Sequence, residues 1–298
     1  MATSPPVISY TTRGKFAILT LNKPNRLNAL SLPEFHDFAR TLDEIDQLKD
    51  VVVTVVTGTG RSFCAGADVS KFTWQTEGDV RRQHLQQLVA ANFYLTRALS
   101  THSKILVIAL NGPAVGGGGA IATFGDFVYA DPKAYLMFPF SSLGLVTEAG
   151  TSRTVVQKLG ISLANDALLT GRRIQAEELL KCGFVNKIIN PATPATPATP
   201  ATGHGDSVLF ESFGIDPPKS ESKVSFLSSV LKELDEWLGD HLNPSSLLGI
   251  KDLIQRPERD IIDAQNVREI FAGVDRLASG VVDREMDKMR SGQKRHKL

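Results

Sequence analysis

The sequence is poor in cysteine, almost neutral in net charge and free of long apolar runs. Its two cysteines, Cys64 and Cys182, cannot form the disulfide framework of a small secreted domain. With a formal net charge of +1 over 298 residues, no basic excess favours nucleic acid as a partner. No run reaches the roughly 18 apolar residues of a membrane span, and residues 1–6 lack a secretory signal pattern. We therefore expect no membrane span, no secretion and no nucleic-acid partner.

Several common catalytic motifs are missing as well. The six histidines and two cysteines show neither H-x-x-x-H nor C-x-x-C spacing, so we expect no metal site. No G-x-x-x-x-G-K-[ST] or G-x-S-x-G motif occurs, which removes the main support for P-loop and serine-hydrolase chemistry. The glycines at 116–119 fail the dinucleotide motif G-x-G-x-x-G, because Ile121 or Ala122 stands where the third glycine is needed.

Strand and helix patterns alternate along the first two thirds of the chain. Ser31, a proline at 33 and Glu34 form a helix start with a capping box. The apolar patterns predict strands at 15–21, 51–57, 105–110, 126–130, 135–138 and 184–189, and helices after Ser31 and at 79–100, 161–170 and 176–181. This alternation predicts an α/β fold with a largely parallel sheet and ligands at the carboxyl ends of its strands.

Loops of small residues follow two of the predicted strands. The strand at 105–110 leads into Asn-Gly-Pro and then the four glycines at 116–119, and the strand at 51–57 leads into the loop 61–69. Backbone N–H groups free of side chains at a helix start can bind an anion, so we interpret the loops as an oxyanion site. The alternative is a glycine-rich turn that only lets a helix pack closely on the sheet.

The remainder of the chain divides into a repeat, a helical segment and a basic end. Residues 191–202 repeat Pro-Ala-Thr four times, which predicts a surface insertion or extended linker in a core spanning 1–205. Apolar stripes at 224–238 and 261–277 predict a helical segment, within 206–298, that makes core or subunit contacts. The final His-Lys-Leu resembles a peroxisomal targeting tripeptide, with a solvated basic tail as the alternative.

Three motifs together resemble the crotonase superfamily, the enoyl-CoA hydratase and isomerase family. They are Asn-Ala-Leu at 28–30, Phe-Cys-Ala-Gly-Ala-Asp at 63–68 and Asn-Gly-Pro-Ala-Val-Gly-Gly at 111–117. The resemblance runs from about residue 8 to the terminus and implies a spiral of ββα turns with a helical C-terminal segment. It also implies a homotrimer or hexamer, an acyl-CoA substrate and no separate cofactor, since CoA is part of the substrate.

In that family the two loops bind the thioester oxygen through backbone N–H groups, which the resemblance places at Ala67 and Gly117. Removing a proton beside a thioester carbonyl puts negative charge on this oxygen, and each donor contributes roughly 3 to 4 kcal/mol in related oxyanion holes. The resemblance implies further substrate contacts at Ala65, Gly66, Asp68 and Val69. Basic residues on nearby loops could meet the CoA phosphates, and the candidates are Lys23, Arg26 and Lys71.

The acidic residues at the expected catalytic positions distinguish a hydratase from an isomerase within this family. The resemblance places the two acids of a hydratase at Ala120 and Phe140, which cannot titrate, so hydration is disfavoured. An isomerase needs one base, and Glu148 matches the catalytic glutamate of peroxisomal Δ3,Δ2-enoyl-CoA isomerases. Asn92 matches an asparagine that holds this glutamate. The alternative for Glu148 is a carboxylate that satisfies free N–H groups at a helix start.

The resulting prediction is a peroxisomal Δ3,Δ2-enoyl-CoA isomerase of fatty acid β-oxidation, imported through a receptor for His-Lys-Leu. Another crotonase-type reaction is the first alternative, either weak enoyl-CoA hydration or dienoyl-CoA isomerisation. The dienoyl reaction calls for a second acid; Asp68 is the obvious one, although in the family its loop binds the adenine end. The other alternative is a non-catalytic acyl-CoA-binding member, which a Glu148 turned away from the thioester would favour.

Overall fold

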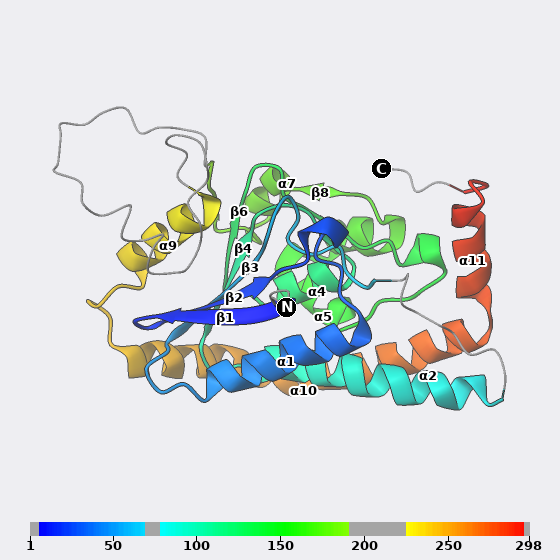
Figure 1. The fold of residues 1–298 in the computed structure, drawn as a ribbon, viewed down its shortest axis with the longest axis horizontal. Coiled ribbons are helices and arrows are strands. Elements are labelled where there is room, and N and C mark those ends of the chain that lie inside the picture. The colour runs from blue at the N-terminus through cyan, green and yellow to red at the C-terminus, as the bar shows by residue number, and fades with distance from the viewer. Residues whose placement is uncertain (1–5, 69–77, 191–224, 295–298) are drawn as a thin grey trace, which may run out of the picture.

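Within residues 6–68, 78–190 and 225–294, which this computed structural model describes, the strands form one six-stranded and one three-stranded sheet (Figure 1). The large sheet has the order β1-β2-β3-β4-β6-β9 and the small sheet the order β5-β7-β8. The strands are β1 (Ile8–Arg13), β2 (Phe16–Leu21), β3 (Val53–Gly58), β4 (Ile105–Leu110), β5 (Ala114–Val115), β6 (Phe127–Ala130), β7 (Tyr135–Met137), β8 (Ile174–Gln175) and β9 (Lys187–Ile188). The Pro-Ala-Thr repeats and the terminal His-Lys-Leu lie outside the described residues.

The large sheet is parallel from β2 through β9, which confirms the prediction. Strand β1 pairs antiparallel with β2 at the edge, and the sequence patterns did not predict it. Its residues are only half-buried or exposed, so they carry little of the apolar signal that marks a buried strand. Strand β9 is shorter than the predicted segment 184–189.

Helices surround the large sheet. They are α1 (Leu32–Asp46), α2 (Val80–Leu88), α3 (Tyr94–Thr101), α4 (Gly117–Thr123), α5 (Thr151–Leu159), α6 (Ile161–Asn165), α7 (Ala176–Lys181), α9 (Phe226–Trp237), α10 (Pro244–Ala278) and α11 (Val281–Arg290). Single turns of 3-10 helix are η1 (Pro24–Arg26) and η4 (Ser141–Leu143), and π turns are η3 (Val89–Phe93) and η5 (Asp166–Thr170).

The two faces of the large sheet are buried by different helices. Alternate residues of β4, such as Leu106 and Ile108, belong to a core cluster with the apolar residues of α1 and α3. The residues between them, such as Ile105 and Val107, pack in a second cluster with α9. All six residues of β4 are buried, as expected for a central parallel strand covered on both faces.

Helix α1 begins as the sequence predicts. Ser31 is its N-cap, and its backbone N–H donates to the Glu34 carboxylate at 2.6 Å. The predicted helix at 79–100, in contrast, is interrupted: α2 and α3 are joined by the π turn η3. Because a π turn inserts an extra residue, the apolar positions before and after it do not share one stripe, and Val89 is 40% exposed.

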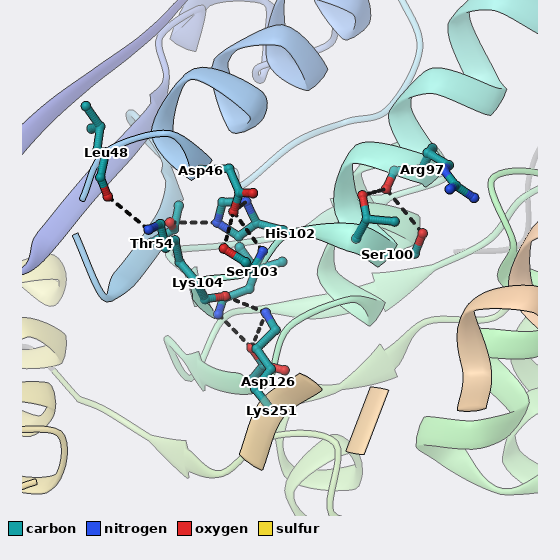
Figure 2. Close-up of polar contacts among 12 residues, drawn as sticks. Asp46, Leu48, Thr54, Arg97, Ser100, His102, Ser103, Lys104, Asp126 and Lys251 are labelled. Atoms are coloured by element: carbon teal, nitrogen blue, oxygen red, sulfur yellow. Dashed lines mark hydrogen bonds and ion pairs between the residues drawn. The ribbon is translucent and has the colours of Figure 1, made fainter. Parts of the chain in front are cut away.

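The long helix α10 is anchored to the sheet by buried polar contacts (Figure 2). The ammonium group of Lys251, with a side chain only 4% exposed, lies 2.7 Å from the Asp126 carboxylate and donates to the Lys104 carbonyl. Lys104 in turn donates to the Leu48 carbonyl at 2.9 Å, and His102 shares a 2.8 Å hydrogen bond with Thr54. Burial and the nearby Lys251 charge lower the pKa of His102 to about 3, so the imidazole is neutral in this cluster. Helix α10 therefore has a fixed position against the core.

Candidate active site

The two small-residue loops lie in contact at the carboxyl ends of β3 and β4. Cys64 and Ala114 form a parallel bridge, and the N–H of Val115 donates to the Cys64 carbonyl at 2.9 Å. A Cβ added to Gly118 would lie 2.3 Å from that same carbonyl oxygen, and one on Gly66 would lie 2.6 Å from the Val115 oxygen. Close packing alone therefore requires these glycines, and it also brings two stretches of bare backbone together.

The backbone N–H groups of Ala67 and Gly117 both lie outside the bridge and helix bonds of their own segments. Ala67 bridges to Leu30 through the Gly66 carbonyl and the Asp68 N–H, so the N–H of Ala67 itself is directed away from that bridge. Gly117 is the first residue of α4, where an N–H has no intrahelical acceptor. A Cβ on Gly66 would lie 3.2 Å from the Gly117 nitrogen, so Gly117 is adjacent to the loop residue that precedes Ala67. Neither N–H has a hydrogen-bond acceptor among the described residues.

Glu148 precedes a tight turn into α5. Ala149 and Gly150 both have left-handed backbone, with φ of 54° and 76°. Few non-glycine residues of the described chain have a positive φ, and Ala149 is one of them. As a whole residue Glu148 is half-buried, and its carboxyl group is the part that the protein shields from water. This burial, reinforced by the negative charge of Glu269, raises the pKa of Glu148 to about 7.

The Asn92 side chain lies beside the Glu148 carboxyl group, within reach of a hydrogen bond to it. Its amide stabilises the ionised carboxylate and partly offsets the rise in the pKa of Glu148. Asn92 lies in the π turn η3, and π turns are frequent at functional sites because the extra residue redirects a side chain. The structure thus brings Asn92 and Glu148 together, although 56 positions of sequence separate them.

The start of α5 is capped by a residue that sequence reasoning missed. The carboxylate of Glu269, on α10, accepts hydrogen bonds from the N–H groups of Gly150 at 2.6 Å and Ser152 at 2.7 Å. The helix-start role considered for Glu148 is therefore filled by Glu269. A signal was present in the sequence, because Asn266 and Glu269 interrupt the apolar stripe at 261–277, and both are buried.

The structure changes the reading of the other charged candidates. Lys23 contacts Glu34 at 2.9 Å and Asp68 at 3.3 Å, so its ammonium group is engaged within the protein and the expectation that it meets a CoA phosphate is weakened. Asp68 is 6% exposed and held in this cluster. Arg26 is exposed on the η1 turn, while Val69 and Lys71 lie outside the described residues.

The positions of the hydratase acids are apolar and buried. Ala120 is 1% exposed inside α4, and Phe140 is 3% exposed. The ring of Phe140 packs against Phe138 with centroids 5.9 Å apart. Neither of these two side chains can therefore exchange a proton.

Comparison with known proteins gives the family. The family model for enoyl-CoA hydratase/isomerase matches residues 11–195. The chain belongs to the enoyl-CoA hydratase/isomerase family. Within this family, a Delta(3,5)-Delta(2,4)-dienoyl-CoA isomerase of Pyricularia oryzae is 44% identical over 295 residues, covering 96% of this chain and 97% of that protein. A 3,2-trans-enoyl-CoA isomerase of Saccharomyces cerevisiae is 29% identical, covering 98% and 96%.

Solved structures agree with the assignment of the fold. The crystal structure of an enoyl-CoA hydratase/isomerase from Pseudoalteromonas atlantica T6c superposes with a TM-score of 0.76 at 24% identity, covering 98% of this chain and all of that one. The sheets and C-terminal helices of this family member therefore have the crotonase fold, as the sequence motifs predicted. Within the described ranges, no helix has both the length and the apolar character needed to cross a bilayer.

Proposed function

We propose that this protein is a Δ3,Δ2-enoyl-CoA isomerase in which Glu148 is the single proton-transferring base. The observation that supports this most is the Glu148–Asn92 pair, which holds a carboxylate with a pKa of about 7. A base with this pKa is substantially ionised at neutral pH and still binds a proton well enough to return it. The apolar Ala120 and Phe140 leave no second titratable group at the hydratase positions.

The proposed reaction is a proton transfer between two carbons of the acyl chain. The Glu148 carboxylate takes a proton from C2, and the released electron pair forms a dienolate whose negative charge develops on the thioester oxygen. The N–H groups of Ala67 and Gly117 stabilise this charge, each by about 3 kcal/mol. The protonated Glu148 then gives its proton to C4, the carbonyl reforms, and the double bond now joins C2 and C3.

The test is an assay with a 3-enoyl-CoA, followed by the absorbance of the conjugated 2-enoyl thioester. Glu148→Gln should reduce the turnover by roughly 100-fold or more, because an amide cannot accept and return a proton. The variant should still bind acyl-CoA, which calorimetry can measure. Turnover above a tenth of that of the unmodified protein would refute Glu148 as the base, and binding without turnover in the unmodified protein would indicate a non-catalytic member.

A second candidate reaction is Δ3,5-Δ2,4-dienoyl-CoA isomerisation. The 44% identity to a Pyricularia oryzae protein of that name favours it. This reaction moves the proton from C2 to C6, a longer path for one carboxylate, and Glu269 is occupied by the α5 N–H groups. Parallel assays with a 3-enoyl-CoA and a 3,5-dienoyl-CoA decide between the two reactions. The compound with the higher kcat/KM is the preferred substrate.

We further propose that the protein acts in peroxisomes as a homotrimer or hexamer. The terminal His-Lys-Leu would be the sequence that an import receptor recognises. A relative from Arabidopsis thaliana, 29% identical over 189 residues, is a peroxisomal dienoyl-CoA isomerase by name. Exposed apolar residues on α10, among them Leu253 and Ile254 at 70% each, support a subunit contact on this helix.

A further inference from the structure

We infer that Glu269, on the C-terminal helix α10, is a positioning residue that holds the turn carrying Glu148 and places a negative charge near it. This inference rests on the proposed role of Glu148. Glu269 lies 121 positions after Glu148 in the sequence, in the segment that the apolar pattern assigned to core or subunit contacts.

The contacts of Glu269 define a clamp on the catalytic turn. Its two carboxylate oxygens accept from the N–H groups of Gly150 and Ser152, at 2.6 and 2.7 Å. The hydroxyl groups of Thr147 and Ser152 lie near the carboxylate and favour its ionised form. The clamp therefore holds the backbone directly after Glu148 and Ala149. The residue is only 5% exposed, so these bonds are shielded from water.

The clamped turn needs this support because its backbone is strained. Ala149 has φ of 54°, a conformation that costs a non-glycine residue free energy, and Gly150 follows it with φ of 76°. Strained backbone persists only where its surroundings hold it. Ala149 directly follows Glu148, so a relaxed turn would redirect the Glu148 carboxylate away from Asn92.

The charge of Glu269 also acts on Glu148. The carboxylate receives backbone and hydroxyl donors, and such bonds favour its ionised form even though burial raises the pKa of Glu269. This negative charge adds to burial in raising the pKa of Glu148. On α5, the charge of Arg153 is paired with Glu258 of α10. On α10, the Arg276 side chain donates to the Gly144 carbonyl.

Helix α10 can hold Glu269 against the start of α5 because polar contacts fix the helix at two further places. Lys251 ties its first half to Asp126 beside the sheet, and Glu258 makes a bidentate contact with Arg153 of α5 at 2.8 to 3.0 Å. Glu258 is thus a carboxylate that joins α10 to α5, as Glu269 does, but its charge is neutralised by an arginine. This difference makes Glu258 the matched control.

The test is the pH profile of kcat/KM for isomerisation of a short-chain 3-enoyl-CoA. The acid limb of the unmodified protein should have its midpoint near pH 7, since Glu148 must be deprotonated to act. Glu269→Gln removes the like charge and lowers the proton affinity of Glu148, so the limb should move down by about one pH unit. At pH 6 the variant would then retain about half of its own plateau, against about a tenth for the unmodified protein.

Two further variants separate tuning from simple support of the fold. Glu258→Gln should leave the limb in place. Glu269→Asp keeps the charge but shortens the reach, so its limb should stay near pH 7 while kcat falls several-fold at unchanged KM. A folded Glu269→Gln protein, checked by circular dichroism, whose limb does not move would overturn the inference. If Glu269→Gln does not fold, an unchanged kcat in Glu269→Asp would overturn it instead.

The result is separable from that of the proposed function. If Glu148→Gln keeps its activity, the acid limb does not belong to Glu148 and the proposed function itself fails. If Glu148→Gln is inactive and the acid limb has the same midpoint in Glu269→Gln as in the unmodified protein, the isomerase assignment stands. Only the role of Glu269 is then refuted.

Discussion

Gly118→Ala is expected to damage the proposed oxyanion site without removing any reacting group. The added Cβ would lie 2.3 Å from the Cys64 carbonyl oxygen and 2.7 Å from the Cys64 Cβ. Ordinary Cβ contacts begin near 3.4 Å, so the backbone at one of the two loops must move by about 1.1 Å, the difference between 3.4 and 2.3. Neither neighbour is the far end of a flexible side chain, so this movement separates the loops.

The displacement falls directly on the paired N–H groups. Gly118 follows Gly117 at the start of α4, and Cys64 lies three residues before Ala67. A misplacement of about 1 Å in a catalytic site can cost on the order of 100-fold in rate, close to the roughly 3 kcal/mol lost with one oxyanion donor. We therefore expect kcat to fall about 100-fold, with about 1 to 3 kcal/mol of lost stability from overpacking.

Steady-state kinetics with a 3-enoyl-CoA and urea unfolding measure the two effects separately. The matched control is Gly249→Ala on α10, where no atom lies within 4 Å of the added Cβ. This control should keep full activity. Its free energy of unfolding should rise by about 0.5 to 1 kcal/mol, because alanine has a higher helix propensity than glycine. A Gly118→Ala enzyme with unchanged kcat would refute the argument that close contact of the loops sets the site.

Two further predictions concern the anchoring of α10 and the targeting of the chain. Lys251→Met should lower the free energy of unfolding by about 3 kcal/mol, since it leaves the Asp126 carboxylate without its buried ammonium partner. Urea unfolding measures this loss, and the double variant with Asp126→Asn should recover part of it. Equal losses in the single and the double variant would contradict the pairing argument. Deleting His296, Lys297 and Leu298 should leave isomerase activity intact but move a tagged protein from punctate peroxisomes to the cytosol, as fluorescence microscopy in cells lacking the full-length copy would show; unchanged puncta would identify the end as a solvated tail.

The sequence by itself determined the local features of this protein. The capping box at Ser31 and Glu34 involves neighbouring residues, so its chemistry could be read directly, as could the apolar run of β4. The family motifs were also local, and they indicated the crotonase fold and the pair Asn92 and Glu148. The glycines of the two loops were recognised for the same reason, because a run without side chains is visible at any position.

The tertiary structure decided the interactions between distant segments. The π turn that carries Asn92 has no distinct composition, so the helical period at 79–100 gave no sign of it. Lys23 was a plausible phosphate ligand until the fold placed it against Glu34 and Asp68. Glu269 was an ordinary interruption of an apolar stripe until α10 brought it to the start of α5.

The proton affinity of Glu148 depends on that same assembly. Burial and the charge of Glu269 raise its pKa to about 7, and both come from segments that meet only in the folded chain. The sequence could identify which residue is the candidate base. Only the packing of α10 against α5 could determine how strong a base it is, because desolvation and charge act through space rather than along the chain.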